Sequence, residues 1–212
     1  MSKIKVGQIG VRHEHASGKM DALRRLTDHY EVVGLVAEEG APEAAQGVYG
    51  GVPRMTEEEL FSVPGLQAIA VETDMKDLVA TATRCMERGL HMHLDKPGGE
   101  AMEPFRQLVE GCRARSLALQ LGYMYRVNPA IGLCLRAVRE GWLGDIFEVH
   151  TVMSRWDDDN YRRFLRRFAG GAMFNFGSHL IDLVIAMLGR PDNVVSFQRA
   201  TRDDGLMDNG LA

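Results

Sequence analysis

The feature that most constrains the fold is a regular alternation of short apolar segments and helical segments over the first 121 residues. The apolar segments are rich in β-branched residues, whereas the segments between them place apolar residues at helical spacing. The predicted strands are residues 3–11, 30–37, 66–71, 91–94 and 117–121. The predicted helices are residues 15–27, 41–49, 57–61, 74–88 and 104–113. This order predicts an α/β domain with a doubly wound parallel sheet and helices on both faces.

The pattern changes after residue 121. Helices are predicted at residues 128–140 and 173–188, alternating strands at 145–155 and 193–201, and a hairpin-like turn at 208–212. Longer strands with fewer helices indicate an α+β domain with an open, mostly antiparallel sheet, so we expect one domain over residues 1–122 and a partial second one over 123–212. Two strands leave open sheet edges, and we expect a homo-oligomer in which a partner chain completes this sheet.

Charge and cysteine content narrow the possible partners and location. The net charge is −4, which gives no electrostatic reason to expect nucleic acid or an anionic membrane as a partner. The three cysteines are widely spaced, and no apolar run approaches the ~18 residues of a membrane span. We therefore expect a reduced, cytoplasmic protein that binds a small molecule.

Polar residues follow several predicted strands, where doubly wound sheets bind their ligands. Gly10 holds the first position of a dinucleotide fingerprint, but Arg12 and His15 replace the later glycines. Glu38 follows the second strand, where a carboxylate would accept hydrogen bonds from an adenosine ribose and repel a 2′-phosphate. Thr73 lies on the same predicted rim. The alternatives are a plain strand-to-helix turn and an exposed glutamate.

Two clusters could carry proton transfer. Lys96 directly follows the predicted strand 91–94, and a polar cluster occupies residues 170–182. If that cluster is helical, its residues Asn175, His179 and Asp182 fall at positions i, i+4 and i+7 and share one face. A lysine and a histidine facing it would suit proton transfer to and from an alcohol.

Four histidines raise the alternative of a metal site, namely His13, His15, His91 and His93. Their spacing matches no standard ligand pattern and no cysteine lies nearby, so we expect no metal. The arginines at 162, 163, 166 and 167 could grip an anionic substrate, but the preferred interpretation is a solvated face.

Several motifs in the same order give the chain a family resemblance. Residues 89–97 read as a strand that ends in Asp-Lys-Pro, which is similar to a known motif that ends in Glu-Lys-Pro. The other motifs are residues 125–129, 141–146 and 170–182. On these motifs the chain resembles the glucose-fructose oxidoreductase and inositol dehydrogenase family (Gfo/Idh/MocA). The resemblance implies an N-terminal Rossmann domain that holds NAD or NADP, with NAD slightly favoured by Glu38, and a C-terminal domain used for oligomerisation.

The resemblance also implies residue roles. Lys96 would contact substrate and nicotinamide, His179 would be the acid/base, and the Lys96–Pro97 peptide bond would be cis. The remaining expected substrate contacts are Asn175, Tyr123, Arg126 and Asp182. The expected cofactor contacts are Gly10, Arg12, His13, Glu38, Thr73, Lys96 and Pro97.

The expected function is hydride transfer between nicotinamide and a sugar, polyol or related cyclic alcohol. One departure motivates an alternative, because the family usually has an aspartate where this chain has Asn175. An amide cannot balance the charge of a nearby cation. The alternative is a catalytically inactive protein of the same fold that senses a nucleotide or sugar. A third interpretation keeps the cofactor but performs redox-assisted elimination or glycoside cleavage.

Overall fold

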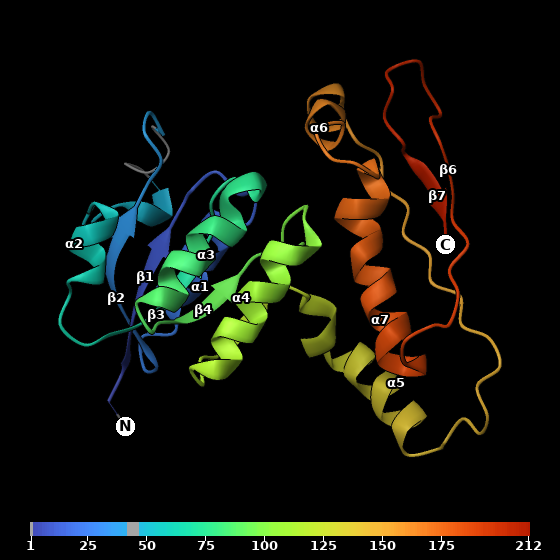
Figure 1. The fold of residues 1–212 in the computed structure, drawn as a ribbon, viewed down its shortest axis with the longest axis horizontal. Helices are drawn as coiled ribbons and strands as arrows, with labels where there is room; N and C mark the ends of the chain where they lie inside the picture. Colours follow the sequence, from blue (N-terminus) through green and yellow to red (C-terminus); the bar gives the residue numbers. More distant parts are fainter. Residues whose placement is uncertain (1, 42–46) are drawn as a thin grey trace. The chain divides into compact units, whose positions relative to one another are not determined.

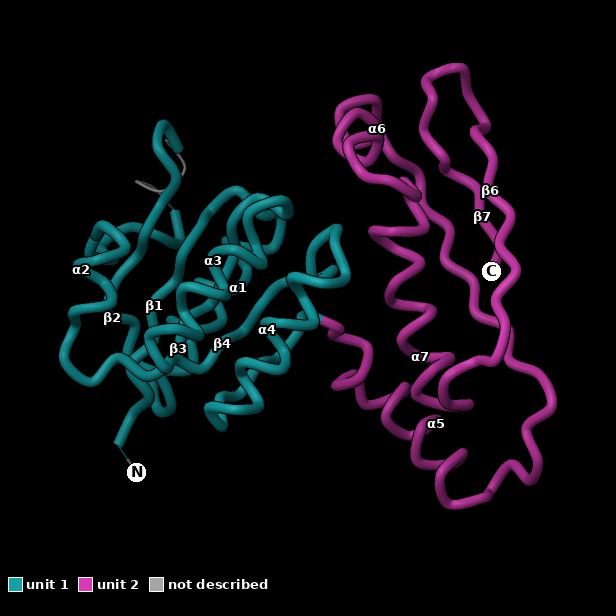
Figure 2. The backbone as a smooth tube through the Cα atoms, in the orientation of Figure 1, with its two compact units in different colours: residues 1–122 teal, residues 123–212 magenta. Residues whose placement is uncertain are grey.

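The computed structural model describes residues 2–41 and 47–212. The chain forms two compact units, unit 1 over residues 1–122 and unit 2 over residues 123–212 (Figure 2). Among the described residues, each of the two sheets is confined to one unit.

Unit 1 is built on a five-stranded parallel sheet. Its strands are β1 (Ile4–Ile9), β2 (Tyr30–Val36), β3 (Leu66–Val71), β4 (His91–Leu94) and β5 (Leu119–Leu121). They are ordered β2-β1-β3-β4-β5, and the first four appear as neighbouring arrows in Figure 1. The predicted strands and their parallel arrangement are confirmed. The order reverses between β1 and β3, and ligands of such sheets bind beyond the strand ends at this switch point.

Helices connect the strands. They are α1 (Ala16–Arg25), α2 (Glu57–Phe61), α3 (Leu78–Glu87) and α4 (Met102–Ala114), with short 3₁₀ turns η2 (Gly47–Tyr49) and η3 (Met75–Asp77). Thr56 and Glu59 form a reciprocal capping box that starts α2. Of the helix predicted at 41–49, residues 42–46 lie outside the described ranges.

The core of unit 1 lies where the sheet meets its helices. Leu35, Ile69 and Leu94 come from three strands and are almost completely buried. Met20 of α1 and Leu78 of α3 are buried with them. Each such side chain contributes about 1.5–3 kcal/mol when it leaves water. The packed sheet therefore gives the loops beyond its strand ends a rigid base.

Unit 2 is mainly helical. Its elements are η4 (Met124–Val127), α5 (Pro129–Arg139), α6 (Asp159–Leu165), η5 (Met173–Gly177), α7 (Ser178–Leu188), β6 (Phe197–Arg199) and β7 (Asn209–Leu211). Asn128 caps α5 through its side chain, and Pro129 occupies the first turn, where its missing N–H costs nothing. The element η5 is a π-helix that runs directly into α7.

Three predictions for unit 2 are wrong. Residues 145–155 form no strand, because this segment has no hydrogen-bonded strand partner among the described residues. The strand predicted at 193–201 is reduced to the three residues of β6. Only these residues pair with the antiparallel strand β7. Residues 209–211, predicted as part of a turn, instead form β7, which pairs with β6.

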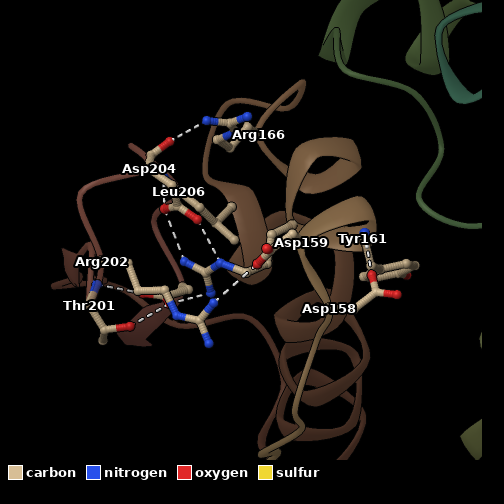
Figure 3. Close-up of polar contacts among 10 residues, drawn as sticks. Asp158, Asp159, Tyr161, Arg166, Thr201, Arg202, Asp204 and Leu206 are labelled. Carbon is tan, nitrogen blue, oxygen red and sulfur yellow. Dashed lines mark hydrogen bonds and ion pairs between the residues drawn. The ribbon is translucent and has the colours of Figure 1, made fainter.

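The helix α6 was not predicted, and it changes the interpretation of the arginine run. Arg162 is buried, and its guanidinium forms ion pairs with Asp204 at 2.6 Å and Asp208 at 2.7 Å. Arg166 donates to the Asp204 carbonyl oxygen at 2.6 Å, so α6 is tied to the segment before β7 (Figure 3). A solvated face is therefore wrong for Arg162, because two carboxylates compensate its burial.

No helix in the described part of the chain is both long enough and apolar enough to cross a bilayer.

Candidate functional site

The loop after β1 approaches the loop after β3 so closely that only glycine fits at position 10. Gly10 has a φ of +97°, and a Cβ atom there would lie 2.3 Å from the Thr73 backbone nitrogen. The Gly10 amide also donates to the Val36 carbonyl oxygen at 2.8 Å. Gly10 and Thr73, both expected to contact cofactor, therefore lie together at the switch point. This is the kind of close backbone approach that a dinucleotide-binding loop requires.

Glu38 joins the same edge from β2. Its Oε2 accepts a hydrogen bond from the Val11 backbone amide at 2.9 Å. Its Oε1 is buried and accepts no hydrogen bond from a described residue. A buried acceptor without a donor is costly, so this oxygen suits a ligand hydroxyl. Arg12 is exposed and donates to the Glu39 carbonyl oxygen at 3.0 Å.

Five side chains at the ends of β1, β3 and β4 form what we call the imidazole–carboxylate cluster, which consists of His13, His15, Glu72, His93 and Asp95. The Asp95 Oδ2 atom lies 3.0 Å from His15 Nδ1 and 3.3 Å from His13 Nδ1. The Glu72 oxygens lie 3.9 Å from His13 Nδ1 and from His93 Nε2. His91, which shares a predicted strand face with His93, instead accepts a hydrogen bond from the Ala118 amide at 2.9 Å.

Burial dominates the electrostatics of this cluster. Burial, followed by the nearby Asp95 charge, raises the pKa of Glu72 to about 9. Burial lowers the pKa of His13, and it lowers the pKa of His93 to about 4. Burial opposes ionisation of Asp95 too, but the hydrogen bond from His15 and the His13 and His15 charges outweigh it and lower the pKa of Asp95. Asp95 is therefore the ionised carboxylate of the pair.

Lys96 lies next to this cluster in the chain and is only 2% exposed. Its backbone amide donates to Asp95 Oδ1 at 2.6 Å. The Lys96–Pro97 peptide bond is cis, as the family resemblance implied. A buried ammonium at the carboxyl end of β4 can stabilise negative charge that develops on a bound group.

The candidate residues of unit 2 surround the junction of η5 and α7. Asn175 is 1% exposed and His179 is 5% exposed. The rings of Tyr123 and Tyr125 lie 5.5 Å and 5.1 Å from the His179 ring. Tyr123 was among the residues expected from the sequence, whereas Tyr125 was not, and its only signal was its place in the motif at residues 125–129. Both tyrosine rings therefore lie close to the imidazole.

Arg126 and Asp182 pair with each other within unit 2. Two parallel hydrogen bonds of 2.7 Å join the Arg126 guanidinium to the Asp182 carboxylate. This bidentate pair raises the pKa of Arg126. Both side chains were expected to contact substrate. In this structure their charged groups form hydrogen bonds with each other.

Glu72 and Asp95 were also missed as members of a site. They are the first residues after β3 and β4, so acidic residues at two strand ends were the available signal.

Comparison with known proteins gives the fold and a likeness to one family. Over residues 134–212 the chain matches the model of the GFO/IDH/MocA C-terminal domain. The WlbA dehydrogenase of Bordetella pertussis, solved in complex with NADH and UDP-GlcNAcA, matches with a TM-score of 0.82 and 22% identity. That match covers 99% of this chain and 67% of the other. The fold is thus that of the Rossmann-type dehydrogenases.

Two curated relatives extend the comparison. The oxidoreductase YhhX of Escherichia coli K12 is 23% identical over 86% of this chain and 53% of its own length. The NADP⁺-dependent scyllo-inositol 2-dehydrogenase IolW of Bacillus subtilis is 22% identical over 69% of this chain and 42% of its own length. These matches confirm the resemblance to the Gfo/Idh/MocA family. The chain spans about half the length of these relatives or less.

Proposed function

We propose that this protein is an NAD(P)-dependent oxidoreductase that transfers hydride between nicotinamide and a sugar, polyol or related cyclic alcohol. The observation that carries the proposal is the close approach of Gly10 to Thr73 beside the Glu38 carboxylate. Relatives with dehydrogenase names, among them IolW and the levoglucosan dehydrogenase of Pseudarthrobacter phenanthrenivorans, support the substrate class.

The residues at the switch point fit a dinucleotide. A Cβ atom at Gly10 would fill the space between the two loops, and the free Glu38 Oε1 supplies an acceptor for a ribose hydroxyl. The remaining proposed contacts are Arg12, His13, Thr73, Lys96 and Pro97. A carboxylate at position 38 disfavours a 2′-phosphate, so NAD is the preferred cofactor.

When bound, the nicotinamide ring supplies the hydride acceptor or donor. In this proposal His179 takes the proton of the substrate hydroxyl, and Tyr123 and Tyr125 hold its ring in place. Lys96 stabilises the developing alkoxide, an effect worth several kcal/mol in a dry site. Asn175 orients the substrate through its amide, with Tyr123, Arg126 and Asp182 as further contacts.

Turnover tests this proposal. The full chain is incubated with NAD⁺ or NADP⁺ and a panel of polyols and cyclic sugars, and formation of the reduced cofactor is followed by absorbance. Formation of NADH with at least one alcohol of the panel supports the proposal. Tight cofactor binding without turnover would favour the inactive sensor, which Asn175 in place of an aspartate motivates. Product formation without net reduction of cofactor would favour redox-assisted elimination.

A further inference from the structure

We propose that the imidazole–carboxylate cluster of unit 1 binds a divalent transition-metal ion, with Zn²⁺ the best-matched ion, through His13, His15 and Asp95. These three residues each offer one ligand atom, and the three atoms lie within 4.8 Å of one another. The proposal rests on the geometry of unit 1 alone. It does not depend on the proposed hydride transfer.

The two separations that involve Asp95 match those around a bound ion. Zinc lies about 2.0–2.2 Å from nitrogen and oxygen ligands, so neighbouring ligands at tetrahedral or octahedral angles are about 3.0–3.5 Å apart. Asp95 Oδ2 lies 3.0 Å from His15 Nδ1 and 3.3 Å from His13 Nδ1. Coordination would use the His13 Nδ1 lone pair that now accepts a long 3.3 Å hydrogen bond from the His15 amide.

Hydrogen bonding and the rigid sheet fix the positions of the proposed metal ligands. The Lys96 amide donates to Asp95 Oδ1 at 2.6 Å, which fixes the carboxylate and leaves Oδ2 directed at the two imidazoles. A hydrogen bond of this kind orients a metal ligand from outside the coordination sphere. His13 and His15 stand two residues apart on the loop after β1, and Asp95 follows β4. The ligands thus come from two loops on one rigid sheet.

A second buried carboxyl group lies beside these ligands. Glu72 is completely buried, and neither of its carboxyl oxygens accepts a hydrogen bond from any residue that the structure describes. One of these oxygens lies 3.9 Å from His13 Nδ1. As a neutral acid, Glu72 shares a side-chain hydrogen bond with Asp95. A dication held by Asp95 would also favour the ionised form of Glu72.

The donor set defines the class of ion. Two imidazoles and one carboxylate suit zinc and neighbouring divalent ions of the first transition row, whereas calcium and magnesium prefer oxygen ligands alone. Three protein ligands leave a coordination position open. Because the His15 side chain is 44% exposed, that position can be reached by water or by an anionic ligand.

Metal titration of the full chain without a polyhistidine tag tests the proposal. The protein carries Cys134→Ser to remove the exposed thiol, is stripped with a chelator, and is titrated with Zn²⁺ by calorimetry and with Co²⁺ by visible absorption. We expect saturable binding of one ion per chain and ligand-field bands for Co²⁺. His15→Ala, at a partly exposed position, and the shape-conserving Asp95→Asn should each weaken binding by at least about tenfold.

The matched control is His29→Ala, which removes an exposed imidazole outside the cluster. It should leave the metal affinity unchanged. Circular dichroism of each variant shows whether it is folded. The proposal is overturned if the Cys134→Ser protein, with His13, His15 and Asp95 intact, shows no saturable metal binding. It is also overturned if folded His15→Ala and Asp95→Asn proteins retain the full affinity.

Discussion

The Val11 backbone amide and the Glu38 carboxylate are joined by a hydrogen bond of 2.9 Å, which connects the loop after β1 to the end of β2. This bond uses one carboxylate oxygen and leaves Oε1 buried without a described donor. The two strand ends that a dinucleotide-binding sheet uses are therefore held in register before any ligand arrives. The following predictions test what this arrangement does.

Gly10→Ala should weaken NADH binding by at least about tenfold, because the new methyl group would push the loop away from Thr73 and out of the dinucleotide path. Gly18→Ala is the matched control, since a Cβ atom there meets nothing within 4 Å and Gly18 lies in α1. The control should bind NADH normally and gain about 0.5–1 kcal/mol of stability. Fluorescence titration and thermal melts measure both effects. Equal affinities in the two variants would remove Gly10 from the site.

Glu38→Gln should reduce the preference for NADH over NADPH by about tenfold, because the amide keeps an acceptor for the Val11 amide but no longer repels a 2′-phosphate. The neighbouring Glu39→Gln, which changes an exposed side chain, serves as the control. Parallel titrations with the two reduced cofactors give the ratio. An unchanged ratio of NADH to NADPH affinity in Glu38→Gln would show that this carboxylate does not discriminate between the two adenosine riboses.

His179→Ala should lower turnover by about 100-fold or more while cofactor affinity is retained, because general base catalysis is lost and the dinucleotide loops are untouched. His150→Ala is the control, because that histidine is exposed and pairs only with Glu148 among the interactions described for it. Steady-state kinetics on the best alcohol of the panel separate the two. Full turnover without the His179 imidazole would assign the proton transfer to another group.

Asp204→Asn should lower the melting temperature by several degrees at neutral pH, because it removes one of the two carboxylates that compensate the buried Arg162. The exposed Arg163→Ala should have little effect. The hydrogen bond from Arg162 lowers the pKa of Asp204 from 3.8 to about 2. The ion pair thus stabilises the fold fully above about pH 4 and is lost as the pH falls towards 2. The difference between wild type and Asp204→Asn should shrink over this range, and a constant difference would contradict the assignment.

The sheet of unit 1 could be predicted because local signals and tertiary contacts agree there. The strands are short and mostly apolar, and β1 to β4 alternate with helices of matching spacing. The positions of Gly10, Glu38 and Thr73 at the strand ends could be predicted for the same reason, since they follow from the order of the elements.

Unit 2 was harder to predict because its structure depends on distant partners. The alternation at residues 145–155 favours a strand, but a strand also needs a neighbour, and the described residues supply none. From the sequence alone, Arg162 resembled a surface charge. Its partners Asp204 and Asp208 lie about forty residues later, and only the folded chain places them beside it. Of the imidazole–carboxylate cluster, the sequence pointed to His13, His15 and His93 but not to Glu72 and Asp95, because the members come from segments separated in sequence.

The central claim is that the switch point of unit 1 holds a nicotinamide dinucleotide. Calorimetric titration of the full chain with NADH measures this directly. The account predicts saturable binding at one site per chain, with an affinity that falls in Gly10→Ala and persists in Gly18→Ala. Absence of saturable binding by both NADH and NADPH to folded wild-type protein would contradict it.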